Sequence, residues 1–349
     1  MKYNVIGLMS GTSLDGLDIA FCEFEKVDEH WNYSILHVET IPYSAEWRRR
    51  LSTLESSSAF EFVAADVEYG HLLGKLTRDF VEKFQLKPNF IASHGHTIFH
   101  QPEKRITSQI GRGSAIAAET GLPVICDFRS LDVALGGQGA PLVPIGDQLL
   151  FGHIEYCLNL GGFANISFQH ADRRIAFDVS PANIVLNYLA RLAGCEYDQD
   201  GRLASEGKIN RQLCEALNSL AFYHTPPPKS LGKEWVVNHI FPILTDQQIP
   251  INDLLATFCE HIAIQVALSA PGSHSDRLMI TGGGALNSFL ISRIRSYTKP
   301  QIIIPDINTI NYKEALIFAF LGVLRWRYED NCMKSVTGAI RDSSGGAVY

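Results

Sequence analysis

The sequence predicts a mixed α/β protein made of two similar domains, and three observations lead to that prediction. The first is length, because 349 residues exceed what one hydrophobic core usually supports. The second is a pattern that occurs twice: an apolar strand, a polar tip with glycines, and a second strand. The third is another apolar strand that runs into three glycines and then into a helical pattern.

The first strand–tip–strand pattern spans residues 4–24 and has the tip GLMSGTSLDG at 7–16. We expect Gly11 and Gly16 to let the backbone turn with positive φ and to approach a ligand closely. Thr12 and Ser13 would offer hydroxyl and N–H donors to phosphate oxygens, and Asp15 would face a metal ion. The same composition is ordinary for a β-hairpin turn, so this tip alone does not establish nucleotide binding.

The next elements follow in order along the chain. Apolar residues keep helical spacing from about 60 to 86, and buried strands are expected at 89–93 and 122–126. Residues 132–147, DVALGGQGAPLVPIGD, are rich in Gly and Pro. We predict that this last segment is the crossing between the two domains.

The pattern then returns at 155–169, EYCLNLGGFANISFQ, and RRIAFDVSPAN adds a third strand that ends at Asp178. This return indicates an internal duplication. Two such tips facing each other across a cleft would hold a polyphosphate. A third glycine loop lies in RLMITGGGALNSFLISRI at 277–294. Glycines between a strand and a helix let a ring or a phosphate lie at the positive helix end, although glycine also serves close packing.

Composition restricts the class of partner. A net charge of −7 and a pI near 5.9 leave no basic stripe for nucleic acid, so a small-molecule substrate fits better. The N-terminus has no signal-peptide pattern and no run of 18 apolar residues occurs, so we expect a cytoplasmic protein without a membrane partner. The seven cysteines lack C-x-x-C spacing, which indicates reduced, buried thiols that serve packing.

A series of blocks along nearly the whole chain resembles the anhydro-N-acetylmuramic acid kinase family. In order they are GLMSGTSLDGLD, SHGHTIFHQP, DFRSLDVALGGQGAPLVP, LNLGGFANIS, PPPKSLGKEW, TGGGALN, YKEALIFAFLG and SVTGA. The resemblance implies the actin-like ATPase and sugar-kinase superfamily, an α/β fold of two RNase-H-like lobes with a nucleotide cleft between them. We therefore expect a first lobe of residues 1–131 and 312–349 and a second lobe of residues 132–311.

The resemblance also implies a reaction. Family members open the 1,6-anhydro ring of anhydro-N-acetylmuramic acid with water and phosphorylate O6 with ATP, which gives N-acetylmuramate 6-phosphate for cell-wall recycling. It follows that we expect ATP and Mg²⁺ as cofactors and an anhydro-amino-sugar as the substrate. The resemblance leaves a homodimer open.

Functional residues carry over by motif. Asp178 corresponds to the catalytic carboxylate, which takes a proton from the attacking water. Asp15 is expected to hold Mg²⁺ through water. The expected nucleotide-binding residues are Gly11, Thr12, Ser13, Leu14, Asp15, Gly16, Leu17 and Asp18, then Asn159, Gly161, Gly162 and Asn165, and finally Gly282, Gly283 and Gly284. The residues expected at the sugar are His94, Thr97, Arg129, Asn183 and Glu314.

The chain departs from the family pattern in two places. The usual Asp-Thr-Gly-Pro-Gly-Asn block reads Asp-Val-Ser-Pro-Ala-Asn at 178–183. Loss of both glycines predicts a stiffer backbone with two extra side chains near the reacting centre. His96 stands where many members have Gln. These changes bear on the identity of the sugar more than on the type of reaction.

Two other readings stay open on the sequence. One is a non-catalytic homologue that binds the anhydro-sugar and nucleotide, in which the altered block has lost turnover. The other is a zinc-dependent hydrolase that uses His94 and His96, although the companion acid expected near H-x-H ligands is missing. Metal analysis and ATP hydrolysis with and without an anhydro-sugar would separate these readings.

Overall fold

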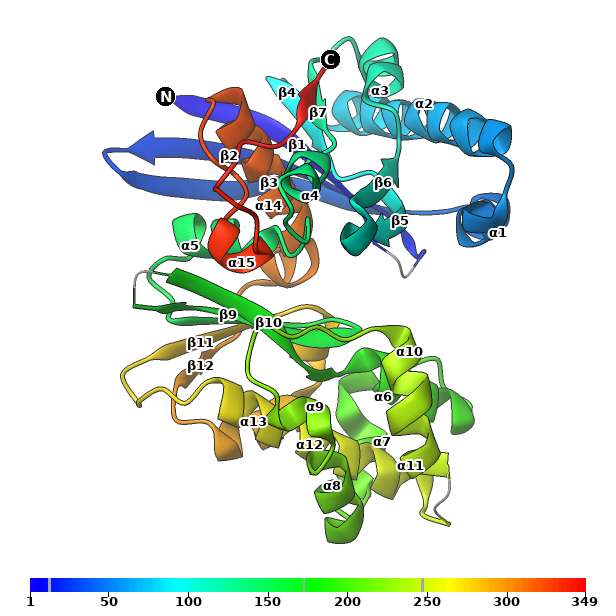
Figure 1. Cartoon of the computed structure of the whole chain (residues 1–349), viewed down its shortest axis with the longest axis vertical. Helices are drawn as coiled ribbons and strands as arrows, with labels where there is room; N and C mark the ends of the chain where they lie inside the picture. Colours follow the sequence, from blue (N-terminus) through cyan, green and yellow to red (C-terminus); the bar gives the residue numbers. More distant parts are fainter. Residues whose placement is uncertain (12–13, 172, 246–247) are drawn as a thin grey trace. The chain divides into compact units, whose positions relative to one another are not determined.

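A computed structural model describes residues 1–11, 14–171, 173–245 and 248–349 and divides the chain into two compact units (Figure 1). Unit 1 comprises Met1–Phe151 and Tyr312–Tyr349, and unit 2 comprises Gly152–Asn311. Each unit has its own sheet and its own hydrophobic core.

Unit 1 is built on a sheet with the strand order β13-β7-β4-β1-β2-β3. Strands β1, β2 and β3 are antiparallel, whereas β4 and β7 continue parallel to β1. Strands β5 and β6 form a separate hairpin. The strand bounds are β1 Lys2–Ser10, β2 Gly16–Val27, β3 His30–Pro42, β4 Phe90–Ser93, β5 His96–Gln101, β6 Ile106–Ile110, β7 Val124–Cys126 and β13 Ala347–Val348.

Helices cover both faces of the unit 1 sheet. On one face, Leu73 of α2 shares a core cluster with Ile6 and Leu8 of β1. On the other face, the ring of Phe320 of α14 packs against the ring of Phe24 of β2, with 5.4 Å between the ring centres. The helix bounds are α1 Ala45–Thr53, α2 Ala59–Phe84, α3 Gly113–Thr120, α4 Ser130–Ala134, α5 Val143–Leu150, α14 Ile307–Trp326 and α15 Lys334–Thr337.

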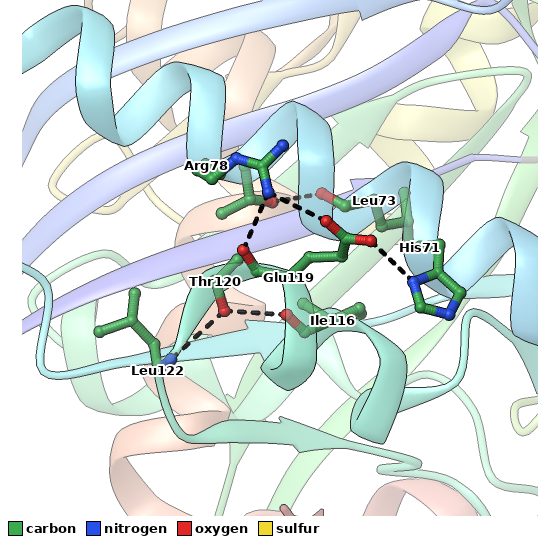
Figure 2. A network of polar contacts seen from close by, with 8 residues as sticks. His71, Leu73, Arg78, Ile116, Glu119, Thr120 and Leu122 are labelled. Carbon is green, nitrogen blue, oxygen red and sulfur yellow. Dashed lines mark hydrogen bonds and ion pairs between the residues drawn. The ribbon is translucent and has the colours of Figure 1, made fainter.

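A polar network joins α2 to α3 (Figure 2). Glu119 of α3 is hydrogen-bonded to His71 Nδ1 at 2.8 Å and accepts from Arg78 at 3.0 Å, both on α2. The hydrogen bond from His71, helped by Arg78, holds the pKa of Glu119 below its usual range. Beside it, the Thr120 hydroxyl donates to the Ile116 carbonyl at 2.9 Å within α3. The two helices are therefore fixed to each other by charge as well as by packing.

Unit 2 repeats the sheet of unit 1. Its strand order is β10-β9-β8-β11-β12, in which β8, β9 and β10 are antiparallel and β11 and β12 continue parallel to β8. The bounds are β8 Tyr156–Leu160, β9 Phe163–His170, β10 Arg173–Pro181, β11 Arg277–Thr281 and β12 Gln301–Ile303. Three antiparallel strands followed by two parallel ones are the arrangement of an RNase-H-like lobe. The predicted mixed α/β fold is confirmed, and the two sheets share this arrangement, as the repeated pattern in the sequence predicts.

Helices pack on one face of the unit 2 sheet through a large apolar cluster that includes Leu158, Ile166 and Phe258. The bounds are α6 Asn183–Leu192, α7 Arg202–Glu206, α8 Arg211–Asn218, α9 Ala221–His224, α10 Lys233–Trp235, α11 Phe241–Thr245, α12 Ile251–Ser269 and α13 Ser288–Tyr297. Within the described residues, α12 is the one helix long and apolar enough to cross a membrane, but 67% of its most apolar stretch is buried inside the structure.

Residues 132–147 are not the crossing between the two units that we expected. They belong to unit 1, so the chain crosses to unit 2 only after Phe151. Asp132 explains this placement, because its buried carboxylate accepts from the Gly139 amide at 2.8 Å and from the Thr337 hydroxyl at 2.7 Å. A second tie is the buried ion pair between Asp147 and Lys313, with a separation of 2.7 Å.

Several local predictions can be compared with the elements. The helix expected at about 60–86 is α2, which begins after a capping box formed by Ser58 and Glu61. The third strand of the second pattern continues past Asp178 to Pro181, with an irregularity between Asp178 and Ser180. Gly283 begins a short 3-10 helix, Gly283–Leu286, so the α-helix expected directly after the three glycines, α13, begins only at Ser288.

The cysteines are all free thiols, and most are buried. Cys195 corrects the expectation of a wholly buried set, because it is exposed just after the end of α6. Cys126 is only partly buried.

Candidate active site

Three strands of the unit 2 sheet bring the predicted site residues Asn159, Asn165 and Asp178 into one row, which a fourth strand extends. Asn165 of β9 pairs with Asn159 of β8 on one side and with Asp178 of β10 on the other. On β11, Thr281 lies just before the three glycines and is the register partner of Asn159 of β8. Residues opposite one another share a face of the sheet. Because Leu158 and Ile166 face the helices, this row points to the opposite face.

The second glycine tip is held by the start of α6. The amides of Asn183 and Ile184 donate to the Gly161 and Gly162 carbonyls, both at 3.1 Å. The Asn183 side chain donates to the Leu160 carbonyl at 3.0 Å, which uses one of its donors within the protein. The first N–H groups of this helix are therefore satisfied by the tip itself.

Two glycines have no structural reason of their own to be glycine. Gly162 and Gly283 both lack a positive φ, and a Cβ added at Gly162 would meet nothing within 4 Å. A Cβ at Gly283 would come no closer than 3.8 Å to the Asn183 side chain. Gly282 differs, because its φ is +80° and its Cβ would lie 2.6 Å from Asn159 Oδ1. Both open positions lie just beyond the ends of adjacent parallel strands.

Asp178 is a partly buried carboxylate with one backbone partner. Its Oδ2 atom accepts from the Leu231 amide at 2.8 Å, and its own amide donates to the Lys229 carbonyl at 3.1 Å. Burial raises the pKa of Asp178 to about 6, against the lowering effect of the Leu231 hydrogen bond. A carboxylate of this pKa can exchange a proton near neutral pH.

The predicted sugar residues of unit 1 include an arginine that other groups hold in place. Arg129 donates through Nη2 to His94 Nε2 at 2.9 Å and through Nη1 to the Gly139 carbonyl at 2.6 Å. Since His94 Nε2 accepts, its Nδ1–H donates to the Gly95 carbonyl at 2.9 Å. Burial, together with Arg129, places the pKa of His94 well below its usual range, so its ring stays neutral.

Glu314 completes this group of charges at the start of the unit 1 part of α14. Burial raises its pKa, and Asp18 adds to that effect while Arg129 opposes it. Burial also lowers the pKa of Arg129 to about 10, so the guanidinium remains charged at neutral pH. Asp18 accepts from the Thr40 hydroxyl at 2.6 Å. Asp18, Arg129 and Glu314 are therefore electrostatically coupled within unit 1.

A polar cavity of about 450 Å³ adjoins His94 in unit 1. Its lining includes Gly95, Gln109, Asp127 and Ser130, from the loop after β4, from β6 and from the segment after β7. Thr97 of β5 is the register partner of Gln109. The cavity is large enough for part of a sugar and offers amide, hydroxyl and carboxylate groups for its hydroxyls.

The first glycine tip differs from its prediction. Gly16 lies in β2 without a positive φ, and an added Cβ would collide with the Ile41 backbone of β3. Among the described residues of the tip, Leu14 has a positive φ, of 61°. Leu17 is 1% exposed in the core, so its side chain does not face a ligand. Asp15 is exposed, whereas Thr12 and Ser13 lie outside the described residues.

The structure gives no support to a zinc site at His94 and His96. Both ring nitrogens of His94 are engaged, and the neighbouring Arg129 cation would repel a metal ion. His96 contacts the Ser10 hydroxyl through Nδ1 at 2.9 Å. Across the residues that are described, no group of three or more His, Cys, Asp and Glu side chains is arranged to hold a metal.

Sequence reasoning did not assign the partners of Asp178. Lys229 and Leu231 lie in the block PPPKSLGKEW. The sequence does not show that they contact Asp178, because Leu231 is 53 residues from it along the chain. The cavity residues Gln109 and Asp127 were also not assigned. The available signal was the run of three prolines before Lys229. Prolines restrict the backbone and lack N–H donors, so they mark 226–231 as a segment with a defined path outside regular helices and strands.

Comparisons with known proteins agree with the resemblance seen in the sequence. The family model described as anhydro-N-acetylmuramic acid kinase matches residues 3–349. Proteins named anhydro-N-acetylmuramic acid kinase are similar over their full length: that of Sulfurovum sp. is 33% identical over 100% of this chain and 99% of its own, and that of Coxiella burnetii is 34% identical over 100% and 98%.

A similar protein with the same name from Vibrio vulnificus is 32% identical over 99% of this chain and 97% of its own. Among solved structures, an activator of 2-hydroxyisocaproyl-CoA dehydratase from Clostridium difficile with bound ADPNP is 14% identical, with a TM-score of 0.46 over 90% of this chain and 92% of that one. The family match and the full-length relatives lead to one conclusion: this chain belongs to the anhydro-N-acetylmuramic acid kinase family.

Proposed function

We propose that this protein uses ATP to open the 1,6-anhydro ring of anhydro-N-acetylmuramic acid and to phosphorylate O6, giving N-acetylmuramate 6-phosphate. The observation that carries the proposal is Asp178, a carboxylate with a pKa of about 6 in the same row as Asn159 and Asn165. A group of this kind suits the activation of water beside a phosphate-binding tip.

The reaction assigns each bond a role. Asp178 takes a proton from water as the water oxygen bonds to the anomeric carbon C1. The bond from C1 to O6 breaks, and its electron pair stays on O6. The freed O6 then bonds to the γ-phosphorus of ATP, and ADP leaves with the electrons of the broken P–O bond.

The glycine loops of unit 2 suit the nucleotide. Because Gly162 and Gly283 have open space where a Cβ would be, a phosphate or a flat ring can lie directly against their backbone. In unit 1 the exposed carboxylate of Asp15 is of the type that binds Mg²⁺ through water. Magnesium bound there would neutralise charge on the phosphates.

The sugar would bind beside Arg129 and Glu314. Arg129 has N–H donors beyond those given to His94 and Gly139, so it can donate to ring substituents. Glu314 can accept from a sugar hydroxyl, or donate to one when protonated. The cavity next to His94 offers room for a substituent of the ring. The ring nitrogens of His94 are engaged within the protein, so its part is to orient Arg129.

The altered block at 178–183 does not by itself favour a non-catalytic protein. Ser180 and Ala182 replace the two family glycines, and both side chains are fully buried in unit 2. Neither has a positive φ. The Ser180 hydroxyl donates to the Pro181 carbonyl at 2.8 Å. The extra atoms therefore fill the interior of unit 2 and do not project toward the reacting atoms.

The test is ADP release with and without anhydro-N-acetylmuramic acid. We expect sugar-dependent release by the natural protein and a loss of about 10²- to 10⁴-fold in Asp178→Asn, because the variant cannot accept a proton. Asp330→Asn is the control for charge, since Asp330 is exposed in unit 1. Sugar binding without any turnover by the natural protein would establish the non-catalytic alternative.

A further inference from the structure

We propose that Lys229 is a positioning residue for Asp178: its ammonium group anchors the segment 229–231, and the Leu231 amide of that segment holds the Asp178 carboxylate. The inference rests on the proposed function, in which Asp178 is the general base. It adds Lys229 as a residue that acts through Asp178 and not on the substrate directly.

The segment 229–231 holds Asp178 from two directions. The Asp178 amide donates to the Lys229 carbonyl at 3.1 Å, and Leu231 returns a hydrogen bond to the carboxylate at 2.8 Å. β10 is an edge strand of its sheet, so the segment pairs with an otherwise open edge at this one residue. The position of Leu231 therefore decides where the carboxylate lies.

The Lys229 side chain is what fastens this segment. Its Nζ donates to the Phe222 carbonyl at 3.1 Å and lies 4.6 Å from the centre of the Phe222 ring. It is also 5.8 Å from the ring of Phe177, the residue just before Asp178. The attraction of a cation to aromatic rings adds to the hydrogen bond that Lys229 donates to the carbonyl. The preceding residues 226–228 are all proline and supply no N–H donor to hold the chain.

The Phe222 carbonyl, which accepts the hydrogen bond from Lys229, lies in a helix that is tied to the core of unit 2. Tyr223, next to Phe222 in α9, is hydrogen-bonded to His261 Nε2 at 2.8 Å, and His261 Nδ1 contacts Asn218 Oδ1 at 2.7 Å. Burial lowers the pKa of His261 to about 3, so its ring is neutral. The amide oxygen of Asn218 can only accept, so Nδ1 donates and Nε2 accepts from the tyrosine hydroxyl. A line of contacts thus runs from the core helix α12 through α9 and Lys229 to Asp178.

The arrangement has a consequence that can be measured. A hydrogen bond to a carboxylate favours its charged form, and at Asp178 this bond opposes the effect of burial. If Lys229 loses its ammonium group, the segment loosens and that bond weakens. The carboxylate then holds its proton to higher pH, so less base is available in mildly acidic solution.

The experiment compares Lys229→Met with Lys229→Arg, which keeps a cation, and with Lys233→Met, a change at an exposed lysine of the same block. Two readouts are taken: titration of the Asp178 carboxyl by ¹³C NMR, and the pH profile of kcat/KM. We expect Lys229→Met to raise the pKa of Asp178 by about one unit, which lowers kcat/KM about fivefold at pH 6 and little at pH 9. The other two variants should follow the natural protein.

A purely structural role would give a different result. In that case Lys229→Met would lower activity equally at every pH and leave the titration of Asp178 unchanged, which overturns the proposal but not the proposed function. If Lys229→Met does not fold, Leu231→Pro is the second variant, because it removes the Leu231 amide that donates to Asp178. It should also raise the pKa of Asp178. An unchanged titration of Asp178 in Leu231→Pro overturns the proposal as well. Full activity of Asp178→Asn would instead overturn the proposed function.

Discussion

At the scale of the residue, the pKa that suits Asp178 to its proposed role as a general base lowers the stability of the folded protein at neutral pH. Its pKa is about 6 in the folded protein and 3.8 in its ordinary state. As pH rises from below 4 to above 6, the unfolded chain ionises first, so the free energy of unfolding falls over this window. Two pKa units correspond to roughly 3 kcal/mol, which is the upper range of that loss.

We therefore expect Asp178→Asn to be more stable than the natural protein at pH 8, by about 1 to 3 kcal/mol, because the amide is neutral at every pH. At pH 3.5 the gain should disappear. Urea unfolding at both pH values measures the difference. Equal stability of the two proteins at pH 8 would mean that the folded state does not disfavour the charged carboxylate.

His94 shows what residue types alone could not reveal. A place for His94 at the sugar stays a prediction, and the structure adds that both of its ring nitrogens are engaged by Gly95 and Arg129. The sequence offers no sign of this, because Arg129 is 35 residues away along the chain and only the fold brings the two together. The same holds for Leu231, which lies 53 residues from Asp178.

At the scale of the element, the contact between α2 and α3 depends on small residues. A Cβ added at Gly74 of α2 would lie 2.6 Å from the Cβ of Glu119 on α3. Alanine is favoured over glycine inside a helix by about 1 kcal/mol, but overpacking costs about 1 to 3 kcal/mol. The Glu119 backbone cannot move freely, because its side chain is tied to His71 and Arg78 (Figure 2).

We expect Gly74→Ala to lower the free energy of unfolding by about 1 kcal/mol, because the overlap outweighs the gain in helix propensity. Asp79→Ala, at an exposed position of the same helix, is the control and should change stability by less than about 0.5 kcal/mol. Urea unfolding of the three proteins checks this. A higher free energy of unfolding for Gly74→Ala than for the natural protein would show that α3 shifts away from the added methyl group without losing stability.

Elements with a regular pattern were predictable and the others were not. α2 has helical spacing and a capping box, and β1 and β8 are short apolar runs. β3 has no counterpart among the expected strands, because it is an edge strand that exposes many of its residues. The turn Gly283–Leu286 was also missed, since glycine at a strand end is compatible with several continuations.

At the scale of the whole molecule, the shared topology of the two sheets was predictable because each unit keeps its strand, tip and strand. The boundary was not, since Gly and Pro in 132–147 indicate irregular backbone and not a domain junction. Buried polar contacts such as that between Asp132 and Thr337 tie this segment to unit 1. The two units differ in their charged residues: unit 1 holds Arg129 and Glu314, and unit 2 holds Asp178.

In the proposed reaction, ring opening at C1 and phosphorylation of O6 are one linked event. The most direct measurement uses anhydro-N-acetylmuramic acid with ¹⁸O in the anhydro bridge, together with ATP and Mg²⁺, and follows the product by ³¹P NMR and mass spectrometry. We expect the label to lie between C6 and phosphorus, with one ADP formed per sugar. Label at C1, or ADP formed without phosphorylated sugar, would contradict the proposed reaction.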